Sequence, residues 1–134
     1  MYLSLLSKNE KELFLNLAYE FSLIDGDYGI EEQQMIESYC NEMQISSTNL
    51  KQSNSLSSVT DVIAQESSIR NKKIIIFEII GLAMSDGKYD DKEKDYIYEL
   101  IQKFMLNDNL SLQCEEVISE YISLQHKINS LVIG

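Results

Sequence analysis

Two segments decide the fold of this chain: FSLIDGDYGIEEQQMIESY at residues 21–39 and GLAMSDGKYDDKEKDYIYEL at residues 81–100. They align at an offset of 61 residues, and the gapless alignment covers residues 13–45 and 74–106. On both sides of each turn, apolar residues recur every three or four positions, which is the period of one helix face. Each segment is therefore predicted to be a helical hairpin. The identical pairs cluster at the turn, namely Asp25/Asp86, Gly26/Gly87, Tyr28/Tyr89, Glu32/Glu93 and Ile36/Ile97.

The shared pattern D-G-x-Y-x-x-x-E suits a junction between two helices. Glycine readily adopts the left-handed backbone that ends a helix, so Gly26 and Gly87 are expected to end the first helix of each hairpin. The aspartates before them, Asp25 and Asp86, are the turn residues that helix architecture accounts for least.

The start of the second helix of each hairpin is predicted by a capping pattern. Gly29 and Asp90 fall at the N-cap position, which places Glu32 and Glu93 at the third helical position. An acid at that position accepts a hydrogen bond from the N-cap amide and completes a capping box. On this interpretation the spacing that the two copies share serves mainly to end one helix and to start the next.

Helical patterns continue outside the two hairpins. Ser7 and Glu10 have the spacing of a capping box, which predicts the start of the first helix. The apolar run at residues 74–85 predicts the central helix of a bundle, because a helix that is apolar on nearly every side must be buried. Residues 45–68 are expected to hold one or two short helices. A final helix at about residues 112–131 has an apolar face that includes Val117, Ile118, Tyr121, Ile122, Leu124 and Ile128.

Composition agrees with a helical globular protein. The 134 residues include no Pro and only five Gly, and 44% are hydrophobic. A chain so poor in turn breakers is expected to consist of helices with short connections. We predict an all-α fold, a pseudo-symmetric bundle of about six to seven helices. It would comprise two helical hairpins plus a C-terminal helix, within a single domain spanning residues 1–134.

The charge of the chain is strongly negative. Twenty-two acidic and eleven basic residues give a formal net charge of −11. Such a field repels phosphate backbones and anionic lipid surfaces, so we expect no nucleic-acid or membrane-surface binding, and instead a basic protein partner. The most apolar run, residues 74–84, is interrupted by Glu78 and is too short to insert across a bilayer. Between Glu12 and Lys51 there is no Lys or Arg. The acids predicted to contact the partner lie there: Glu20, Asp25, Asp27, Glu31, Glu32, Glu37 and Glu42. The alternative is that the charge serves solubility alone.

A second interpretation concerns divalent cations. An EF-hand is excluded, because its first and third loop positions would be Phe21 and Leu23 in one copy, and Leu82 and Met84 in the other. If the pseudo-symmetry brings both turns together, however, their acids would form one concavity that could hold Ca²⁺ or Mg²⁺ through oxygen ligands. The predicted ligands are Asp25, Asp27, Glu32, Asp86, Asp90 and Glu93.

The paired turns resemble the signature of the TerB-like family, which is linked to tellurite resistance. That signature is an apolar or small helix end, then D-G, then an acid four to six residues later that opens the next helix. The resemblance covers about residues 13–106. It implies an all-helical fold, a role in stress-response or membrane-associated complexes, and a divalent-cation site that includes Asp25, Glu32, Asp86 and Glu93.

The chain departs from the family signature at three positions. Ile24 and Ser85 stand where the family commonly has Ala, and Gly29 replaces the usual capping residue. TerB-like domains also serve as generic scaffolds, so the resemblance implies a fold more strongly than a function.

Residues that support catalysis are few. Cys40 and Cys114 are far apart and are expected to be reduced core residues, and His126 lies alone on the final helix. There is no nucleophile–base set and no Gly-rich phosphate loop, so no catalytic residue is predicted. Glu78 interrupts the apolar run, either as a buried acid or as a rim residue paired with Lys72 or Lys73.

Two functions remain from the sequence. One is a non-enzymatic, acidic adaptor of TerB-like type in a stress response, with a divalent cation as its candidate cofactor. The other is an immunity protein or antitoxin whose acidic face blocks a basic toxin such as a ribonuclease. The N-terminus lacks the features of a signal peptide, so the cytoplasm is the expected location.

Overall fold

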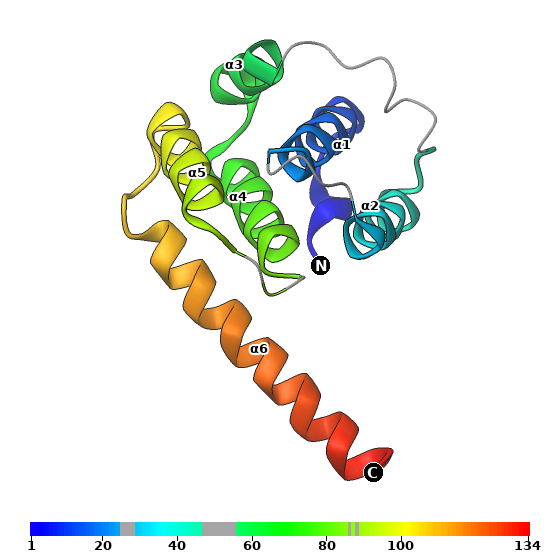
Figure 1. The fold of residues 1–134 in the computed structure, drawn as a ribbon. Coiled ribbons are helices and arrows are strands. Elements are labelled where there is room, and N and C mark those ends of the chain that lie inside the picture. Colours follow the sequence, from blue (N-terminus) through cyan, green and yellow to red (C-terminus); the bar gives the residue numbers. More distant parts are fainter. Residues whose placement is uncertain (25–28, 47–55, 86, 88) are drawn as a thin grey trace.

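Six α-helices and one 3₁₀ turn make up the described part of the chain (Figure 1). The computed structural model describes residues 1–24, 29–46, 56–85, 87 and 89–134. Within these ranges there is no strand, which confirms the prediction of an all-α fold. The elements are η1 (Leu3–Leu5), α1 (Lys8–Ser22), α2 (Ile30–Met43), α3 (Leu56–Glu66), α4 (Ile69–Met84), α5 (Asp91–Lys103) and α6 (Leu110–Val132).

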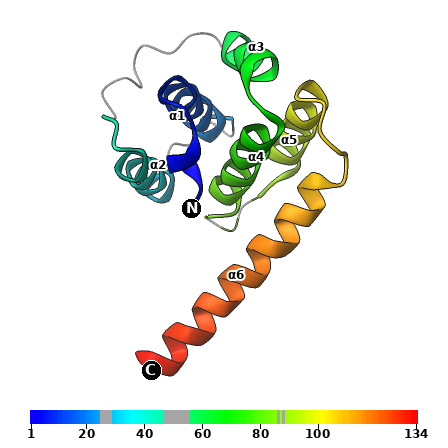
Figure 2. The same cartoon turned by 180° about the vertical axis from the view of Figure 1, so that it is seen from behind.

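Helix α4 lies at the centre of the bundle, as its apolar sequence predicts. It packs against α1, α5, α6 and η1, and both cartoon views show it between neighbouring helices (Figures 1 and 2). Ile75, Ile76, Ile79 and Ile80 are all fully buried, so α4 is covered on more than one side. These side chains join buried residues of the other elements in one hydrophobic cluster.

The internal repeat begins earlier in the structure than the alignment from residue 13 suggested. Ser7 caps α1 by accepting a hydrogen bond from the amide of Glu10 at 3.2 Å. Ser68, 61 residues later, caps α4 in the same way, from the amide of Asn71 at 3.1 Å. The second unit therefore starts its first helix with the same cap, and the Ser7/Ser68 identity is the sequence signal that marks this start.

The ends of the hairpins repeat equally closely. Gln44 after α2 and Met105 after α5 are 61 residues apart and have left-handed φ angles of 57° and 58°. In both copies the following amide donates to a carbonyl five residues back, from Ile45 to Cys40 and from Leu106 to Ile101, each at 3.0 Å. This Schellman-type closure satisfies carbonyls that a helix end leaves without partners.

The two units meet at a pair of equivalent residues. Asn71 Nδ2 donates to Glu10 Oε1 at 2.8 Å, and residues 10 and 71 occupy the same position in the two units. The contact therefore joins equivalent positions of the two units. Burial would raise the pKa of Glu10, but hydrogen bonds from Ser67, Ser7 and Asn71 outweigh it and lower the pKa. The carboxylate thus ties α1 to the start of α4.

Helix α6 is present as predicted, but only the first part of its apolar face packs on the bundle. Only Cys114 and Ile118 of this helix are buried, and its C-terminal half extends away from the other helices (Figures 1 and 2). The apolar pattern correctly predicted the helix, but pattern alone does not reveal where the rest of the bundle ends. None of the helices in the described ranges has both the length and the apolar character of a membrane span.

Candidate functional site: the turn acids and the outer face of helix α2

The turn acids that the structure describes serve as helix caps. The Gly29 amide donates to Glu32 Oε2 at 2.9 Å at the start of α2. At the start of α5, the Glu93 amide donates to Asp90 Oδ1 at 2.9 Å, and the Asp90 amide donates back to Glu93 Oε1 at 3.2 Å. The predicted capping positions are confirmed. Gly29 has no side chain, so α2 has only the glutamate half of the box.

The remaining residues predicted as cation ligands, Asp25, Asp27 and Asp86, lie outside the described residues. In the described ranges, no group of three or more His, Cys, Asp or Glu side chains is placed to hold a metal ion. The rings of Phe21 in α1 and Tyr96 in α5 lie 5.6 Å apart, so the end of α1 packs against the opposite hairpin. Because Asp25, Asp27 and Asp86 lie outside the described residues, the cation site stays a prediction.

The predicted helix-ending glycines have different outcomes. Gly87 has a φ of +74°, in the left-handed region that favours glycine, which confirms its expected role after α4. Gly26 lies outside the described residues.

The outer face of α2 is the most acidic surface among the described helices that lacks compensating bases. Helix α2 contains four Glu and no Lys or Arg, whereas α5 contains four acids and three Lys. Its apolar side faces the core through Ile36, Tyr39, Cys40 and Met43. We define the acidic α2 surface as the exposed residues of the other side: Ile30, Glu31, Gln34, Glu37, Ser38 and Asn41.

The predicted partner-binding acids divide between this surface and the rest of the molecule. Glu31 and Glu37 are exposed on it, and no Lys or Arg within the described ranges forms an ion pair with either. Glu20 is partly buried on α1, where its charge contributes to the raised pKa of Tyr96, a shift caused mainly by burial of the phenol. Glu42 lies at the far end of α2, where its carboxylate contacts the amino group of Met1.

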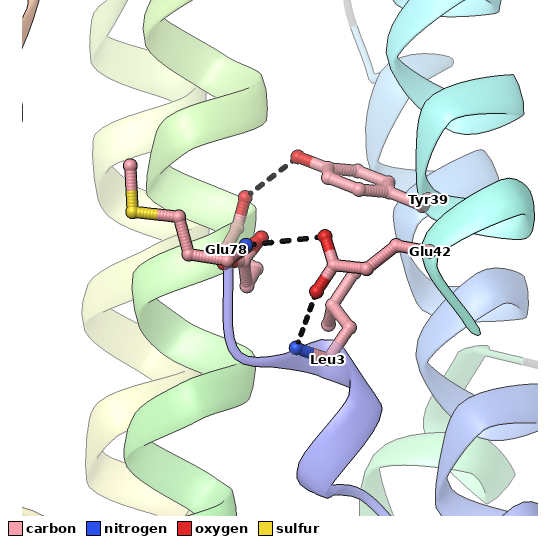
Figure 3. A network of polar contacts seen from close by, with 5 residues as sticks. Leu3, Tyr39, Glu42 and Glu78 are labelled. Carbon is pink, nitrogen blue, oxygen red and sulfur yellow. Dashed lines mark hydrogen bonds and ion pairs between the residues drawn. The ribbon is translucent and has the colours of Figure 1, made fainter.

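Glu42 and Glu78 together hold the amino group of Met1. Figure 3 shows these two glutamates beside Leu3 and Tyr39. The α-amino nitrogen lies 2.8 Å from Glu78 Oε1 and 3.2 Å from Glu42 Oε1. The Leu3 amide donates to the second oxygen of Glu42 at 2.9 Å. Burial lowers the pKa of this amino group, but its contacts with both carboxylates outweigh burial and raise the pKa above 8.0. The contact therefore fastens the N-terminal segment to α2 and α4.

Sequence reasoning did not find this partner for Glu78. The side chain is buried, with 5% of its surface exposed, and its cation is the amino group of Met1 and neither nearby lysine. Lys72 donates to the Phe104 carbonyl at 3.4 Å instead. Tyr39 also reaches this point, because its buried hydroxyl donates to the backbone carbonyl of Glu78 at 3.0 Å (Figure 3). No local sequence signal links residues 1 and 78.

The equivalent contact in the second unit has the opposite arrangement of charges. Residue 103, which corresponds to residue 42, is a lysine whose Nζ lies 2.6 Å from Asp61 Oδ1 and 2.8 Å from Thr60 Oγ1. In each unit, the segment before the first helix is thus fastened to the end of the second helix by an ion pair. Glu42 is therefore accounted for by the fold.

The two cysteines are free and buried, as predicted. Burial, with a smaller contribution from the nearby carboxylates Glu37 and Glu115, raises the pKa values of Cys40 and Cys114. A thiol that ionises less readily is a poor nucleophile and a poor metal ligand at neutral pH.

The fold and this surface define a duplicated helical-hairpin protein with an acidic face on one hairpin. Comparison of the chain with protein-family models, with curated proteins and with solved structures finds no significant match. The resemblance to the TerB-like family accordingly depends on the turn residues alone.

Proposed function

We propose that this protein is a non-enzymatic binding protein that docks a basic protein on the acidic α2 surface. The observation that carries the proposal is the exposed and uncompensated charge of Glu31 and Glu37 on a helix with no Lys or Arg. Opposite charge on a partner would accelerate association and favour that partner over acidic proteins.

The acidic α2 surface also offers an apolar anchor. Ile30 is 70% exposed at the start of α2, in line along the helix with Gln34 and Glu37. Lysine and arginine side chains combine an aliphatic stem with a charged head. A basic side chain could pack its stem on Ile30 while its head meets Glu31 or Glu37, so the surface suits a basic protein better than free cations.

Asymmetry between the hairpins supports a role for one helix. The D-G sequence and the helix ends repeat in both units, but the outer face of α5 mixes acids with Lys92 and Lys94. If architecture alone set the charge of α2, its counterpart would not need to differ in this way. The repeat therefore does not explain the uncompensated charge of α2, whereas a binding role for this helix does.

The described residues offer little support for catalysis. Glu32 and Glu93 are engaged as helix caps, and both thiols have raised pKa values. His126 is exposed on the protruding half of α6. Within the proposal, an adaptor of TerB-like type and an inhibitor of a basic toxin differ in their partners and in whether binding requires a divalent cation.

The test is co-purification of the full chain from its own cells, with and without a chelator, followed by mass spectrometry. A single small basic protein retained with chelator and lost at high salt is expected for an inhibitor. Loss of the partners on chelation would instead support the cation-dependent adaptor. A set of partners with no basic surface would contradict docking by charge.

Paired variants test the surface itself. Glu31→Lys with Glu37→Lys should weaken partner binding at least about tenfold, because attraction is replaced by repulsion at the contact. The matched control is Asp95→Lys with Glu99→Lys, which makes the same charge change on exposed positions of α5. Equal loss in both variants would mean that only net charge matters, and would rule out the α2 surface as the docking site.

A further inference from the structure

Helix α6 carries a regular apolar stripe, and along the protruding half of the helix nothing in the described structure covers it. Its members follow alternating spacings of three and four residues along the helix, the pattern of a coiled-coil seam. They are Cys114, Val117, Tyr121, Leu124, Ile128 and Leu131.

The body of the molecule covers only the first part of this stripe. Cys114 is 8% exposed, whereas Val117 is 54%, Leu124 54%, Ile128 50% and Leu131 86% exposed. Both cartoon views show this part of α6 running clear of the other helices (Figures 1 and 2). A lone helix is marginally stable in water, and packing of its apolar face is what normally stabilises it.

Charge along α6 changes sign from one half to the other. The first half carries Glu115, Glu116 and Glu120, and the second half carries Lys127. Glu120 and Lys127 are seven residues apart, and each directly precedes a stripe residue, Tyr121 or Ile128. In coiled-coil terms both occupy the g position beside the seam, where charged residues set orientation and partner.

We propose that α6 pairs with α6 of a second copy of this chain in an antiparallel coiled coil. In the register that closes on itself, Val117 packs against Ile128 of the second copy and Tyr121 packs against Leu124 of the second copy. The two-fold operation then repeats both layers, as an isologous interface requires. This proposal does not depend on the proposed function of the α2 surface.

The charged residues Glu120 and Lys127 favour the same antiparallel register. With Tyr121 opposite Leu124 of the second copy, Glu120 of each copy lies beside Lys127 of the other, so two ion pairs flank the seam. A parallel pair would instead place Glu120 near Gln125 and Lys127 near Val132, which leaves both charges without partners. The stripe and its flanking charges are therefore complementary to themselves in one orientation.

A membrane surface is a poorer occupant. Helices that bind anionic lipids carry Lys and Arg on the polar face, whereas α6 has one Lys and three Glu. The same acids make a basic partner possible only for the first half of the helix. A second copy accounts for the stripe, both charged residues and the change of sign together.

The first test is the mass of the purified full chain in solution across a concentration series, by analytical ultracentrifugation. A reversible monomer–dimer equilibrium is expected. Leu124→Glu should weaken the dimer at least about tenfold, because it places a charge in the seam. The control, Ser123→Glu, adds the same charge to an exposed residue outside the stripe and should leave dimerisation intact. A wild-type chain that stays monomeric at all concentrations, or associates only with anionic vesicles, overturns the proposal.

The second test fixes orientation by exchanging charges. Lys127→Glu alone should weaken the dimer at least about tenfold, since it opposes Glu120 of the other copy. The double variant Glu120→Lys with Lys127→Glu should restore the affinity, because the exchanged charges pair again only in the antiparallel register. A double variant as weak as the single one would overturn that register.

Discussion

At the scale of single residues, Glu78 shows how one buried charge can depend on a distant part of the chain. Its equivalent in the first unit is Leu17, which is fully buried, so the repeat itself requires no acid at this position. The carboxylate is instead matched by the amino group of Met1. The carboxylate of Glu78 is buried, whereas the amino group of Met1 is only partly buried, and loss of their contact removes a charge-assisted hydrogen bond that stabilises the fold.

Glu78→Gln is therefore expected to reduce the free energy of unfolding by about 1–3 kcal/mol. Urea unfolding followed by circular dichroism measures this change. Asp95→Asn is the control, because it removes a charge from an exposed position of α5 and should change stability by no more than about 0.5 kcal/mol. Equal stability of the two variants would mean that the contact with Met1 contributes nothing.

The same contact predicts a dependence of stability on pH. The amino group of Met1 has a pKa raised above 8.0 in the folded chain, so the folded state holds this proton more tightly than the unfolded state. Its contribution to stability is complete below about pH 8 and disappears as the pH rises through the raised value. The stability advantage of the wild type over Glu42→Gln with Glu78→Gln should therefore shrink as the pH rises above about 8.

Comparison with that variant is needed because other groups titrate in the same range. Burial also raises the pKa values of Cys40 and Cys114 from 9.0, and these thiols are present in both proteins, so their effect cancels in the difference. An advantage of the wild type that does not shrink as the pH rises above about 8 would contradict the assignment of the effect to Met1.

At the scale of secondary-structure elements, the two helix ends after α2 and α5 carry a backbone cost. Gln44 and Met105 both adopt a left-handed conformation that costs L-residues about 1–2 kcal/mol, and glycine adopts it without that penalty. Both positions are exposed, so no side-chain packing opposes the substitution.

Gln44→Gly and Met105→Gly are each expected to increase the free energy of unfolding by about 0.5–1 kcal/mol. Thermal unfolding measures the change. Asn41→Gly, at an exposed position inside α2, is the control and should destabilise by a similar amount, because glycine there only adds flexibility to the unfolded chain. Destabilisation by glycine at position 44 or 105 would show that the two helix ends are not strained.

The sequence allowed prediction of these elements wherever the signal was local. The capping positions of Glu32 and Glu93 follow from spacing within a single helical turn, and the structure has them as predicted. The repeat was detectable from residue 13, but Ser7 and Ser68 show that it starts six residues earlier. Identical pairs before residue 13 are too sparse to mark the start of the repeat from sequence alone. The start became evident because Ser7 and Ser68 cap equivalent helices.

Features that depend on distant contacts were beyond prediction. The partner of Glu78 comes from the N-terminus, 77 residues away, and nothing near residue 78 indicates it. The exposure of the stripe on α6 also depends on where the other helices end, because periodicity reports an apolar face but not its neighbour. Of the candidate site, Glu31 and Glu37 lie exposed as a contact surface requires, whereas Glu42 is taken up by the N-terminal contact.

At the scale of the whole molecule, the net charge of −11 opposes folding through self-repulsion. Raising NaCl from about 0.01 M to about 0.15 M shortens the Debye length from about 30 Å to about 8 Å. We expect the melting temperature to rise by roughly 4 °C over this range, equivalent to about 1 kcal/mol. Differential scanning calorimetry measures the rise, and a melting temperature that falls would contradict self-repulsion.

Divalent cations extend this measurement to the predicted cation site. Screening alone predicts the same melting temperature in NaCl and in MgCl₂ or CaCl₂ at equal ionic strength. An extra rise with Mg²⁺ or Ca²⁺, abolished by Asp25→Asn with Asp86→Asn, is the result expected if the two DG turns hold an ion. The same variant serves as the control, since it removes the predicted ligands and leaves the capping glutamates in place.

The protrusion of α6 has a consequence for affinity. Two copies joined along this helix would form a short rod, about 35 Å long for 23 residues, with one acidic α2 surface carried on the body at each end. Such a molecule is bivalent. Against a monomeric basic protein each surface would act alone, but against a partner with two basic sites the second contact would form at a high effective concentration. Slow release from repetitive partners would then come from geometry, without any change in the contacts of a single surface.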